Sequence, residues 1–252
     1  MTLTPQDQGS RNVPVDVTVL IPAHNEEQTI AEAISRSASG LVSANKTGEI
    51  LVVDDGSSDA TRMKVLEESK KTHAEVRLVR HERKRGVSVA LRTGIRNARG
   101  AMILIIPGDL ESDPEQDIPL LLENMSDADL VAGWRQGRIG SKVVASRLYN
   151  FLYRNVLGVN VHDANWIKCF KRQVADHMIW TRDWNRYLVF FAARAGFRII
   201  EVPVPYYRRQ HGQSKFGIMR LPSGFVGFLK TYHEVSKRSK ERVRSLPSPM
   251  AS

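Results

Sequence analysis

The first half of the chain alternates between short continuous apolar runs and longer stretches with helical spacing. The apolar runs, rich in Val, Ile and Leu, cover residues 15–22, 49–55, 75–80, 101–107 and 128–134. Continuous runs of this length predict strands that are buried on both faces, as in parallel sheets. The stretches between them predict helices at residues 26–39, 57–71, 86–98 and 114–125. We therefore predict an α/β fold in which helices flank both faces of a mostly parallel sheet.

The rhythm changes in the second half of the chain. Residues 141–157 have the spacing of an amphipathic helix, and residues 161–166 predict a loop. The remaining pattern predicts helices at residues 172–180 and 188–195, followed by a strand within residues 197–209.

The length and composition fit one domain with flanking segments. With 252 residues, of which 42% are hydrophobic and 25% charged, the chain can bury one substantial core. The predicted parts are a flexible leader at residues 1–14, a domain at residues 15–220, and a basic tail at residues 221–252. This tail is either an amphipathic helix or a disordered segment.

Cysteine usage and the N-terminal sequence predict a cytoplasmic protein. Cys169 is the only cysteine, which excludes an internal disulfide framework. The N-terminus lacks the basic and apolar regions of a signal peptide. No apolar run approaches the roughly 20 residues that cross a bilayer, so the sequence predicts no membrane span.

The net charge of +10 is concentrated at the C-terminal end, where residues 205–252 carry ten Lys or Arg and two acids. Such an asymmetry points to an anionic partner, either a phosphate-bearing ligand or a membrane surface. Nucleic acid is disfavoured because the charge lies in a tail without a recognised binding motif. Residues 221–240 combine aromatics with lysines, so this segment either lies on the cytoplasmic membrane face as a peripheral helix or packs on the domain.

Polar loops follow each of the five predicted strands of the first half. Ligands of parallel sheets bind at the carboxyl ends of the strands, so we expect a binding site at these loops. They combine carboxylates, arginines and glycines and read "PAHNEE", "DDGSSD", "HERKRG", "PGDLESD" and "GWRQGR". Neither GxGxxG nor GxxxxGK[ST] occurs, which argues against NAD, FAD or a P-loop.

Two pairs of carboxylates are candidates for ligand contacts. Asp54 and Asp55 follow the second predicted strand and can accept hydrogen bonds from a nucleobase or a ribose, whereas Asp59 is expected to cap the next helix. In an extended segment, Asp109 and Glu111 would point to the same side and could share a cation. Mg²⁺ or Mn²⁺ would fit, because such ions combine one or two carboxylates with water and substrate phosphates.

The last part of the acidic stretch is predicted to be structural. Asp113 precedes Pro114 and is the expected N-cap of the helix at residues 114–125. Glu115 would then lie in the first turn, where a negative charge complements the helix dipole.

Basic residues provide candidates for binding phosphate, because guanidinium groups bind phosphate oxygens in pairs. The stretch "RRQHGQSKFG" at residues 208–217 also predicts a mobile loop that closes over an anion. The candidates are Arg85, Arg135, Arg147, Arg208, Arg209 and Lys215.

The stretches "PAHNEE", "VVDDGSSDAT", "GVSVALRTGIRNARG", "GDLESDPE", "GWR" and "RRQHGQSKFG", in this order, resemble family 2 glycosyltransferases with a GT-A fold. The similarity covers residues 15–220 and is greatest to dolichol- or polyprenyl-phosphate sugar synthases. It implies inverting transfer of a sugar from a nucleotide-diphosphate donor, a GDP- or UDP-sugar, to the phosphate of a lipid carrier. The same fold acting on a soluble small molecule or nucleoside is the alternative. A non-catalytic protein that binds nucleotide sugars or phospholipids is a third reading.

The resemblance also implies roles for individual residues. Asp109 and Glu111 would hold the metal, while Arg135, Ser146 and Arg147 would lie near the acceptor phosphate. Residues expected at the nucleotide are Pro22, Ala23, Asn25, Glu26, Asp54 and Asp55. Residues expected at the donor diphosphate are Arg209, Ser214 and Lys215, with Arg85 as a further phosphate ligand.

The acceptor decides whether a base is needed. A phosphomonoester is mostly ionised at neutral pH, since its second pKa is about 6, and can attack without a general base. Positioning, together with stabilisation of the leaving diphosphate by metal and arginine, would then supply catalysis. A hydroxyl acceptor would require a carboxylate, for which Asp163 is the candidate, although a loop-bracing role also fits it. The catalytic candidates are Asp109, Arg135, Arg147 and Asp163.

The acidic motif departs from the pattern of the family in two places. Pro107 stands where the family usually has its first aspartate, and Glu111 stands where a glutamine is common. We therefore expect either weaker metal binding or a metal that relies on Glu111.

Overall fold

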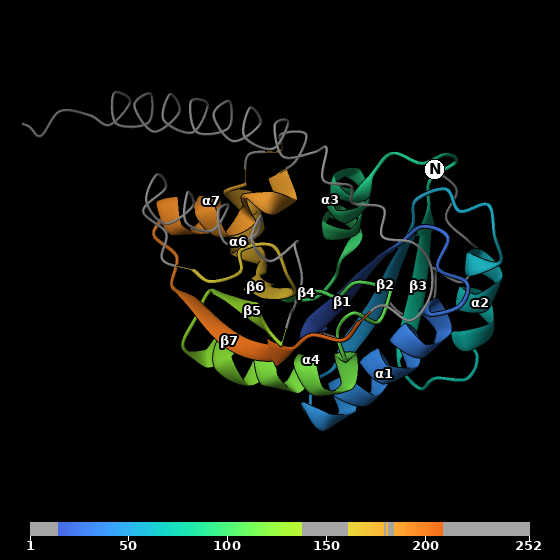
Figure 1. Cartoon of the computed structure of the whole chain (residues 1–252), viewed down its shortest axis with the longest axis horizontal. Helices are drawn as coiled ribbons and strands as arrows, with labels where there is room; N and C mark the ends of the chain where they lie inside the picture. The colour runs from blue at the N-terminus through green and yellow to red at the C-terminus, as the bar shows by residue number, and fades with distance from the viewer. Residues whose placement is uncertain (1–14, 138–160, 179, 181–183, 209–252) are drawn as a thin grey trace, which may run out of the picture. The chain divides into compact units, whose positions relative to one another are not determined.

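The computed structural model describes residues 15–137, 161–178, 180 and 184–208 (Figure 1). Within this part of the chain, seven strands form one sheet in the order β3-β2-β1-β4-β6-β5-β7. The strands are β1 (Val17–Ala23), β2 (Gly48–Asp54), β3 (Glu75–Arg80), β4 (Met102–Ile105), β5 (Leu130–Gln136), β6 (Lys168–Lys171) and β7 (Ile199–Pro205). All neighbouring strands are parallel except β6, which runs antiparallel to both β4 and β5. The predicted mostly parallel sheet is confirmed.

Helices cover both faces of the sheet, as predicted. Figure 1 shows α1 and α4 on one face and α3, α6 and α7 on the other. The helices are α1 (Ile30–Ser43), α2 (Thr61–Glu68), α3 (Val87–Asn97), α4 (Pro114–Glu123), α6 (Arg172–Asp176) and α7 (Leu188–Arg194), with short 3-10 helices η2 (Asn124–Ser126) and η3 (Trp184–Arg186). No described helix is long and apolar enough to cross a membrane.

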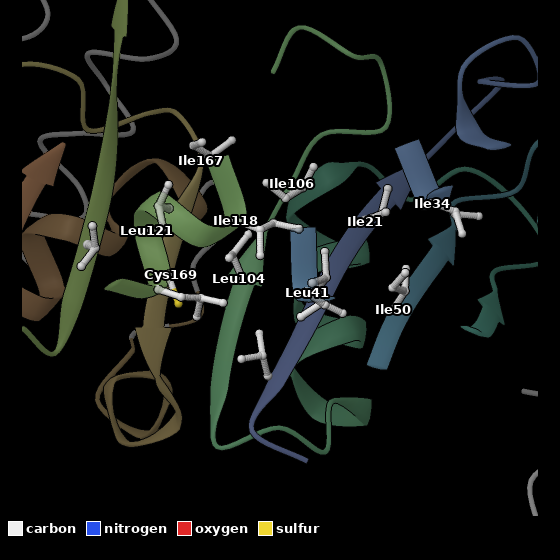
Figure 2. Close-up of a cluster of buried hydrophobic side chains, with 14 of the residues drawn as sticks. Ile21, Ile34, Leu41, Ile50, Leu104, Ile106, Ile118, Leu121, Ile167 and Cys169 are labelled. Carbon is white, nitrogen blue, oxygen red and sulfur yellow. The ribbon is translucent and has the colours of Figure 1, made fainter. Parts of the chain in front are cut away.

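The main core lies between the sheet and the pair formed by α1 and α4 (Figure 2). Ile21, Ile34 and Leu104 are completely buried there, and each such side chain contributes about 1.5–3 kcal/mol relative to exposure. Gly40 lets the two helices approach closely, because a Cβ at this position would lie 2.6 Å from the carbonyl oxygen of Pro114. Cys169 belongs to the same core, and burial raises the pKa of its thiol. The single cysteine is therefore a core residue.

Gly100, which follows the third helix, does not cap it. Helix α3 ends at Asn97, where Ala98 takes an extended conformation with ψ 141°. Gly100 is instead required by packing, because a Cβ there would lie 2.3 Å from the backbone nitrogen of Thr18. Its N–H donates to Oγ1 of Thr18 at 2.9 Å and ties the start of β4 to β1.

Two further elements differ from the prediction. Strand β6 was not predicted, because four residues with lysine at both ends do not form a continuous apolar run. The helix predicted from residue 172 to 180 is only the five-residue α6, and α1 begins at Ile30 rather than Glu26. The predicted leader, the helix at residues 141–157 and the basic tail lie outside the described residues.

A buried cluster of charges joins the amino ends of the strands. Glu49 on β2 is completely buried and accepts hydrogen bonds from Oγ1 of Thr18 at 2.7 Å and from Nη1 of Arg77 at 2.8 Å. The backbone N–H and the Nε of Arg99 donate to the same carboxylate at 2.7 and 2.9 Å, and Arg99 also pairs with Glu75. We call these five residues the amino-end cluster.

Candidate functional site

The carboxyl ends of β1, β2, β3 and β4 and the amino end of the antiparallel β6 lie at one edge of the sheet and carry a set of loops that we call the rim: residues 24–29, 55–60, 81–86, 106–113 and 161–167. The first two of these loops bind each other directly. The N–H of Asn25 donates to Oγ of Ser57 at 2.9 Å, and Oδ1 of Asn25 accepts the N–H of Ser58 at 2.9 Å. The N–H of Glu26 donates to Oγ1 of Thr61 at 2.8 Å.

Asn25 makes this junction possible and explains the late start of α1. It has a φ of 54°, in the left-handed region that Asn tolerates better than most residues. The chain therefore turns at Asn25 instead of continuing from Glu26 as a helix. Of the predicted residues, Asn25 and Glu26 lie in the rim, and Pro22 and Ala23 are the last two residues of β1, directly before it.

Asp54 is completely buried at the end of β2, and the fold uses both of its carboxylate oxygens. Oδ1 accepts the N–H of Ser57 at 2.8 Å, and Oδ2 accepts Nε of Arg80 at 3.1 Å. The side chain closes the turn after β2 and joins that turn to β3. The structure thus gives Asp54 a bracing function, while its predicted contact with a nucleotide stays a prediction.

Asp55 organises the loop that carries Arg85. Its Oδ1 bonds to Nδ1 of His81 at 2.7 Å and accepts the N–H of Arg85 at 2.9 Å, while Oδ2 accepts the N–H of Gly86 at 2.7 Å. The other ring nitrogen of His81 lies 3.0 Å from Oγ1 of Thr93 on α3. Gly86 has a φ of 98°, a conformation that favours glycine. Asp55 therefore sets the backbone from which the exposed Arg85 extends.

Asp59 performs the capping role predicted for it, although α2 has Ala60 at its formal N-cap. Its Oδ1 accepts the N–H of Thr61 at 3.0 Å, and its Oδ2 accepts the N–H of Glu27 at 3.2 Å. Burial opposes ionisation of Asp59, but the hydrogen bonds from Thr61 outweigh it and lower the pKa of the carboxyl group. Asp59 thus stabilises both the helix and the junction of the first two loops.

The loop at residues 106–113 turns where the sequence predicted an extended segment. Leu110 has a φ of 56°, which is a left-handed and not an extended conformation. The prediction of an extended segment is therefore wrong, and strand alternation cannot be used to place Asp109 and Glu111 on one side. Oδ1 of Asp109 accepts the N–H of Glu111 at 3.3 Å. Two hydrogen bonds hold this loop. Oγ1 of Thr29, directly before α1, donates to the carbonyl of Gly108 at 2.7 Å, and the N–H of Tyr207, two residues after β7, donates to the carbonyl of Glu111 at 3.1 Å.

The described residues fit a metal that depends on its substrate. No group of three or more His, Cys, Asp or Glu among them could hold an ion. Asp109 and Glu111, the two carboxylates predicted to hold the metal, are both half-buried in this loop. One or two carboxylates, completed by water and a diphosphate, match the coordination that Mg²⁺ accepts.

The structural role predicted for Asp113 is confirmed. It is the N-cap of α4, its side chain accepts the N–H of Glu115 at 3.3 Å, and Pro114 occupies the first turn. Asp117 was not among the predicted residues. It is completely buried and accepts the N–H of Asp113 through Oδ2 at 3.1 Å. Burial, with a smaller contribution from the charge of Asp113, raises the pKa of Asp117 to about 7.

Arg135 and Asp163, predicted for different roles, form an ion pair with each other. Nε and Nη2 of Arg135, near the end of β5, donate to Oδ2 and Oδ1 of Asp163 at 2.5 and 2.9 Å. The side chains are 11% and 8% exposed. The guanidinium carbon lies 4.4 Å from the centroid of the Trp166 ring. Both oxygens of Asp163 are thus bound by Arg135, as its loop-bracing alternative expects.

Two residues next to this pair were not predicted. Lys168 on β6 is 5% exposed and donates from Nζ to the carbonyl of Trp166 at 2.6 Å. Burial lowers the pKa of Lys168 to about 8, although the nearby charge of Asp163 opposes this shift. Glu201 on β7 accepts the N–H groups of His162 and Asp163 at 2.8 and 3.0 Å. A charged residue at an otherwise apolar strand position was the only signal in the sequence.

Several predicted residues lie outside the described part of the chain. Arg208 is described: it is exposed and lies three residues after the end of β7. The predicted residues outside the described part, which include most of the predicted closing loop, are Ser146, Arg147, Arg209, Ser214 and Lys215.

Comparison with known proteins gives the family. The model of glycosyl transferase family 2 matches residues 18–179, which is more than half of the chain and includes all five loops of the rim. This chain belongs to glycosyl transferase family 2. The resemblance seen in the loop motifs is therefore confirmed.

Two curated proteins are similar to this chain over most of its length. One, from Rhizobium johnstonii, is a dodecaprenyl-phosphate galacturonate synthase, 30% identical over 214 residues that cover 82% of this chain and 63% of the relative. The other, from Edwardsiella ictaluri, is an undecaprenyl-phosphate 4-deoxy-4-formamido-L-arabinose transferase, 31% identical over 209 residues that cover 81% of this chain and 64% of the relative. The chain spans less than two thirds of the length of these relatives.

Solved structures confirm the GT-A fold of this family 2 member. Glucosyl-3-phosphoglycerate synthase from Mycobacterium tuberculosis, in a complex with Mn²⁺, UDP and glucosyl-3-phosphoglycerate, matches with a TM-score of 0.62 and 22% identity. The match covers 79% of this chain and 73% of that chain.

Proposed function

We propose that this family 2 glycosyltransferase moves a sugar from a nucleotide-diphosphate donor, a GDP- or UDP-sugar, to a polyprenyl phosphate, with inversion at the anomeric carbon. The observation that carries the proposal is that both curated relatives are named for a polyprenyl phosphate and match more than four fifths of this chain. The geometry of Arg135 at the rim supports the same conclusion.

The donor would occupy the joined loops at the ends of β1, β2 and β3. Asn25 and Asp55 lie at this junction, and Arg85 extends from the backbone that Asp55 holds. When bound, Mg²⁺ or Mn²⁺ would neutralise charge on the leaving diphosphate. Asp109 and Glu111 are the residues that would hold it.

The acceptor phosphate would bind at Arg135, together with Ser146 and Arg147. A phosphate nucleophile needs no general base, and this agrees with a site in which Arg135 binds both oxygens of Asp163. A hydroxyl acceptor would require Asp163 to leave this ion pair before it could take a proton.

An assay of transfer tests the function directly. The chain is incubated with a panel of UDP- and GDP-sugars, Mn²⁺ or Mg²⁺, and a short-chain polyprenyl phosphate, and products are identified by mass spectrometry. We expect a lipid-phosphate sugar with at least one donor. No lipid product with any donor, together with transfer to a soluble acceptor, would show that the acceptor is a small molecule.

Peripheral binding on the cytoplasmic membrane face would bring the enzyme to a lipid acceptor. Cosedimentation with vesicles containing anionic phospholipid tests this part. Binding that weakens as salt rises is expected if the basic tail is responsible, because salt screens exposed charges. Equal recovery with neutral and anionic vesicles would contradict it.

A further inference from the structure

Arg135 uses only one edge of its guanidinium within the described part of the protein. Nε and one N–H of Nη2 form the two bonds to Asp163. The second bidentate edge consists of Nη1 and the other N–H of Nη2, and it has the spacing of two phosphate oxygens. None of the described residues accepts a hydrogen bond from Nη1. The pair therefore holds a guanidinium whose outer edge can bind an anion.

The plane of the guanidinium is fixed by Trp166. The guanidinium carbon of Arg135 lies 4.4 Å from the ring centroid of Trp166, a distance at which the cation and the ring attract each other. The ring lies edge-on to Tyr206 with the centroids 6.2 Å apart, and the backbone carbonyl of Trp166 accepts Nζ of the buried Lys168 at 2.6 Å. A bidentate partner on one edge and a ring on one face together restrict rotation of the guanidinium.

Glu201 anchors the loop that supplies both of these partners. Its side chain is 11% exposed, and Oε1 accepts the N–H groups of His162 and Asp163 at 2.8 and 3.0 Å. Oε2 also bonds to Nδ1 of His162 at 2.9 Å, and the His162 ring stacks on Trp134 with the centroids 4.0 Å apart. The backbone that carries Asp163 is thus fixed to β7 by one carboxylate.

We propose that Glu201 and Trp166 are positioning residues, which aim the outer edge of Arg135 at the phosphate of the acceptor. The proposal deepens the proposed function and rests on it, because it takes a phosphate acceptor at Arg135. Glu201 acts through the backbone of His162 and Asp163, and Trp166 acts through the face of the guanidinium. Asp163 then serves as the partner that holds Arg135 rather than as a base.

Asp129 provides a matched control on the same strands. It lies directly before β5, at the end opposite the rim, where its Oδ1 accepts Nζ of Lys171 at 3.0 Å and its Oδ2 accepts the N–H of Arg198 at 3.0 Å. Like Glu201, Asp129 is a carboxylate that joins neighbouring segments. Its loss should affect stability without changing the geometry of Arg135.

The test compares Glu201→Ala, Glu201→Gln, Trp166→Leu, Trp166→Phe and Asp129→Ala in the full chain. Calorimetry measures the Kd of geranyl phosphate, and kinetics with a short-chain polyprenyl phosphate measure KM for acceptor and donor separately. We expect Glu201→Ala and Trp166→Leu to raise the acceptor KM and the Kd by up to about 100-fold, because small misplacements of a binding group are costly. The donor KM should not change.

The conservative variants distinguish positioning from a general loss of structure. Glu201→Gln keeps an oxygen that accepts backbone N–H groups, and Trp166→Phe keeps a ring face, so both should retain most of the acceptor affinity. Asp129→Ala should lower the melting temperature and leave the acceptor KM unchanged. A folded Glu201→Ala variant with the wild-type acceptor KM would overturn the proposal, as would an equal loss of acceptor affinity in Asp129→Ala.

Failure of the proposed function would look different. In that case the wild type itself would neither bind geranyl phosphate nor form a lipid product with any donor, and both proposals would fall. A wild type that binds and transfers normally, with variants equal to it, would remove the positioning role alone. If Asp163→Asn lowered kcat at unchanged acceptor KM and removed one limb of the pH profile, Asp163 would be a base and the proposal would be wrong.

Discussion

Buried charged groups are hydrogen-bonded more completely at the amino end of the sheet than at the carboxyl end. At the amino end, Glu49 is completely buried but is bonded by Thr18, Arg77 and Arg99. At the carboxyl end, Arg135 donates to Asp163 from one edge of its guanidinium. The buried Asp117 accepts the backbone N–H of Asp113 through one oxygen. The other oxygen of Asp117 has no hydrogen-bond partner within the described residues.

The pKa values of the two buried acids show the same contrast. Burial alone would raise the pKa of Glu49, but hydrogen bonds from Arg77, Thr18 and Arg99 outweigh it and lower the pKa. Burial raises the pKa of Asp117 to about 7, and no cation among the described residues opposes this shift. Removing one partner from the pairs at the amino end would leave an uncompensated charge inside the fold, whereas Arg135 at the carboxyl end keeps one guanidinium edge for a ligand.

The largest expected effect is on metal-dependent transfer at the rim. Asp109→Ala should abolish it, because the variant loses one of the two carboxylates proposed to hold the ion. Asp113→Ala is the control, since the loss of this N-cap should cost about 1 kcal/mol of stability and leave the metal dependence intact. Activity is measured against Mn²⁺ concentration, and unfolding with urea. Equal loss of activity in both variants would mean that the loop acts as one structural unit.

At the amino end, Glu49→Ala should destabilise the fold by about 3–5 kcal/mol, because it leaves the partly buried Arg77 and Arg99 without their completely buried partner. The control is Glu75→Ala, which removes a side chain that is 38% exposed and should cost less than about 1 kcal/mol. Urea unfolding measures both variants. A loss below 1 kcal/mol for Glu49→Ala would show that the amino-end cluster is not a stability element.

Arg135→Lys should lower kcat/KM for the acceptor by about 10²–10³-fold, because an ammonium cannot hold Asp163 and a phosphate on two separate edges. The matched control is Arg96→Lys, at an exposed position in the last turn of α3, which should have wild-type kinetics. Steady-state kinetics with varied acceptor provide the measurement. Full activity of Arg135→Lys would show that a point charge is sufficient.

The last expected effect is a pH dependence of stability from Asp117. The folded pKa of about 7 lies above the ordinary value of 3.8, so the folded state binds more protons between these values. The contribution of Asp117 to stability therefore falls as pH rises from 3.8 to about 7, and it levels off above that value. Asp117→Asn should lack this fall when both proteins are unfolded with urea across the range. Parallel curves would place the pKa of Asp117 near its ordinary value.

The sequence predicted most strands and helices because their signals are local. A continuous apolar run such as that of β1 and a proline after an N-cap, as at Asp113 and Pro114, need no information from the rest of the chain. The ordered loop motifs also indicated the family correctly. Strand β6 was missed because its pairing with β4 and β5, and not its own composition, makes it a strand.

The sequence by itself therefore determined the fold class, the family and the loops that form the rim. Only the tertiary structure decided which charges meet, because Arg135 and Asp163 are 28 positions apart, and Glu201 lies 38 positions beyond Asp163. It also decided that the loop turns at Leu110, where a left-handed backbone overrides alternation. The physical reason is that a hydrogen bond requires two groups within about 3 Å, and the path of the whole chain, rather than its local pattern, brings distant groups that close.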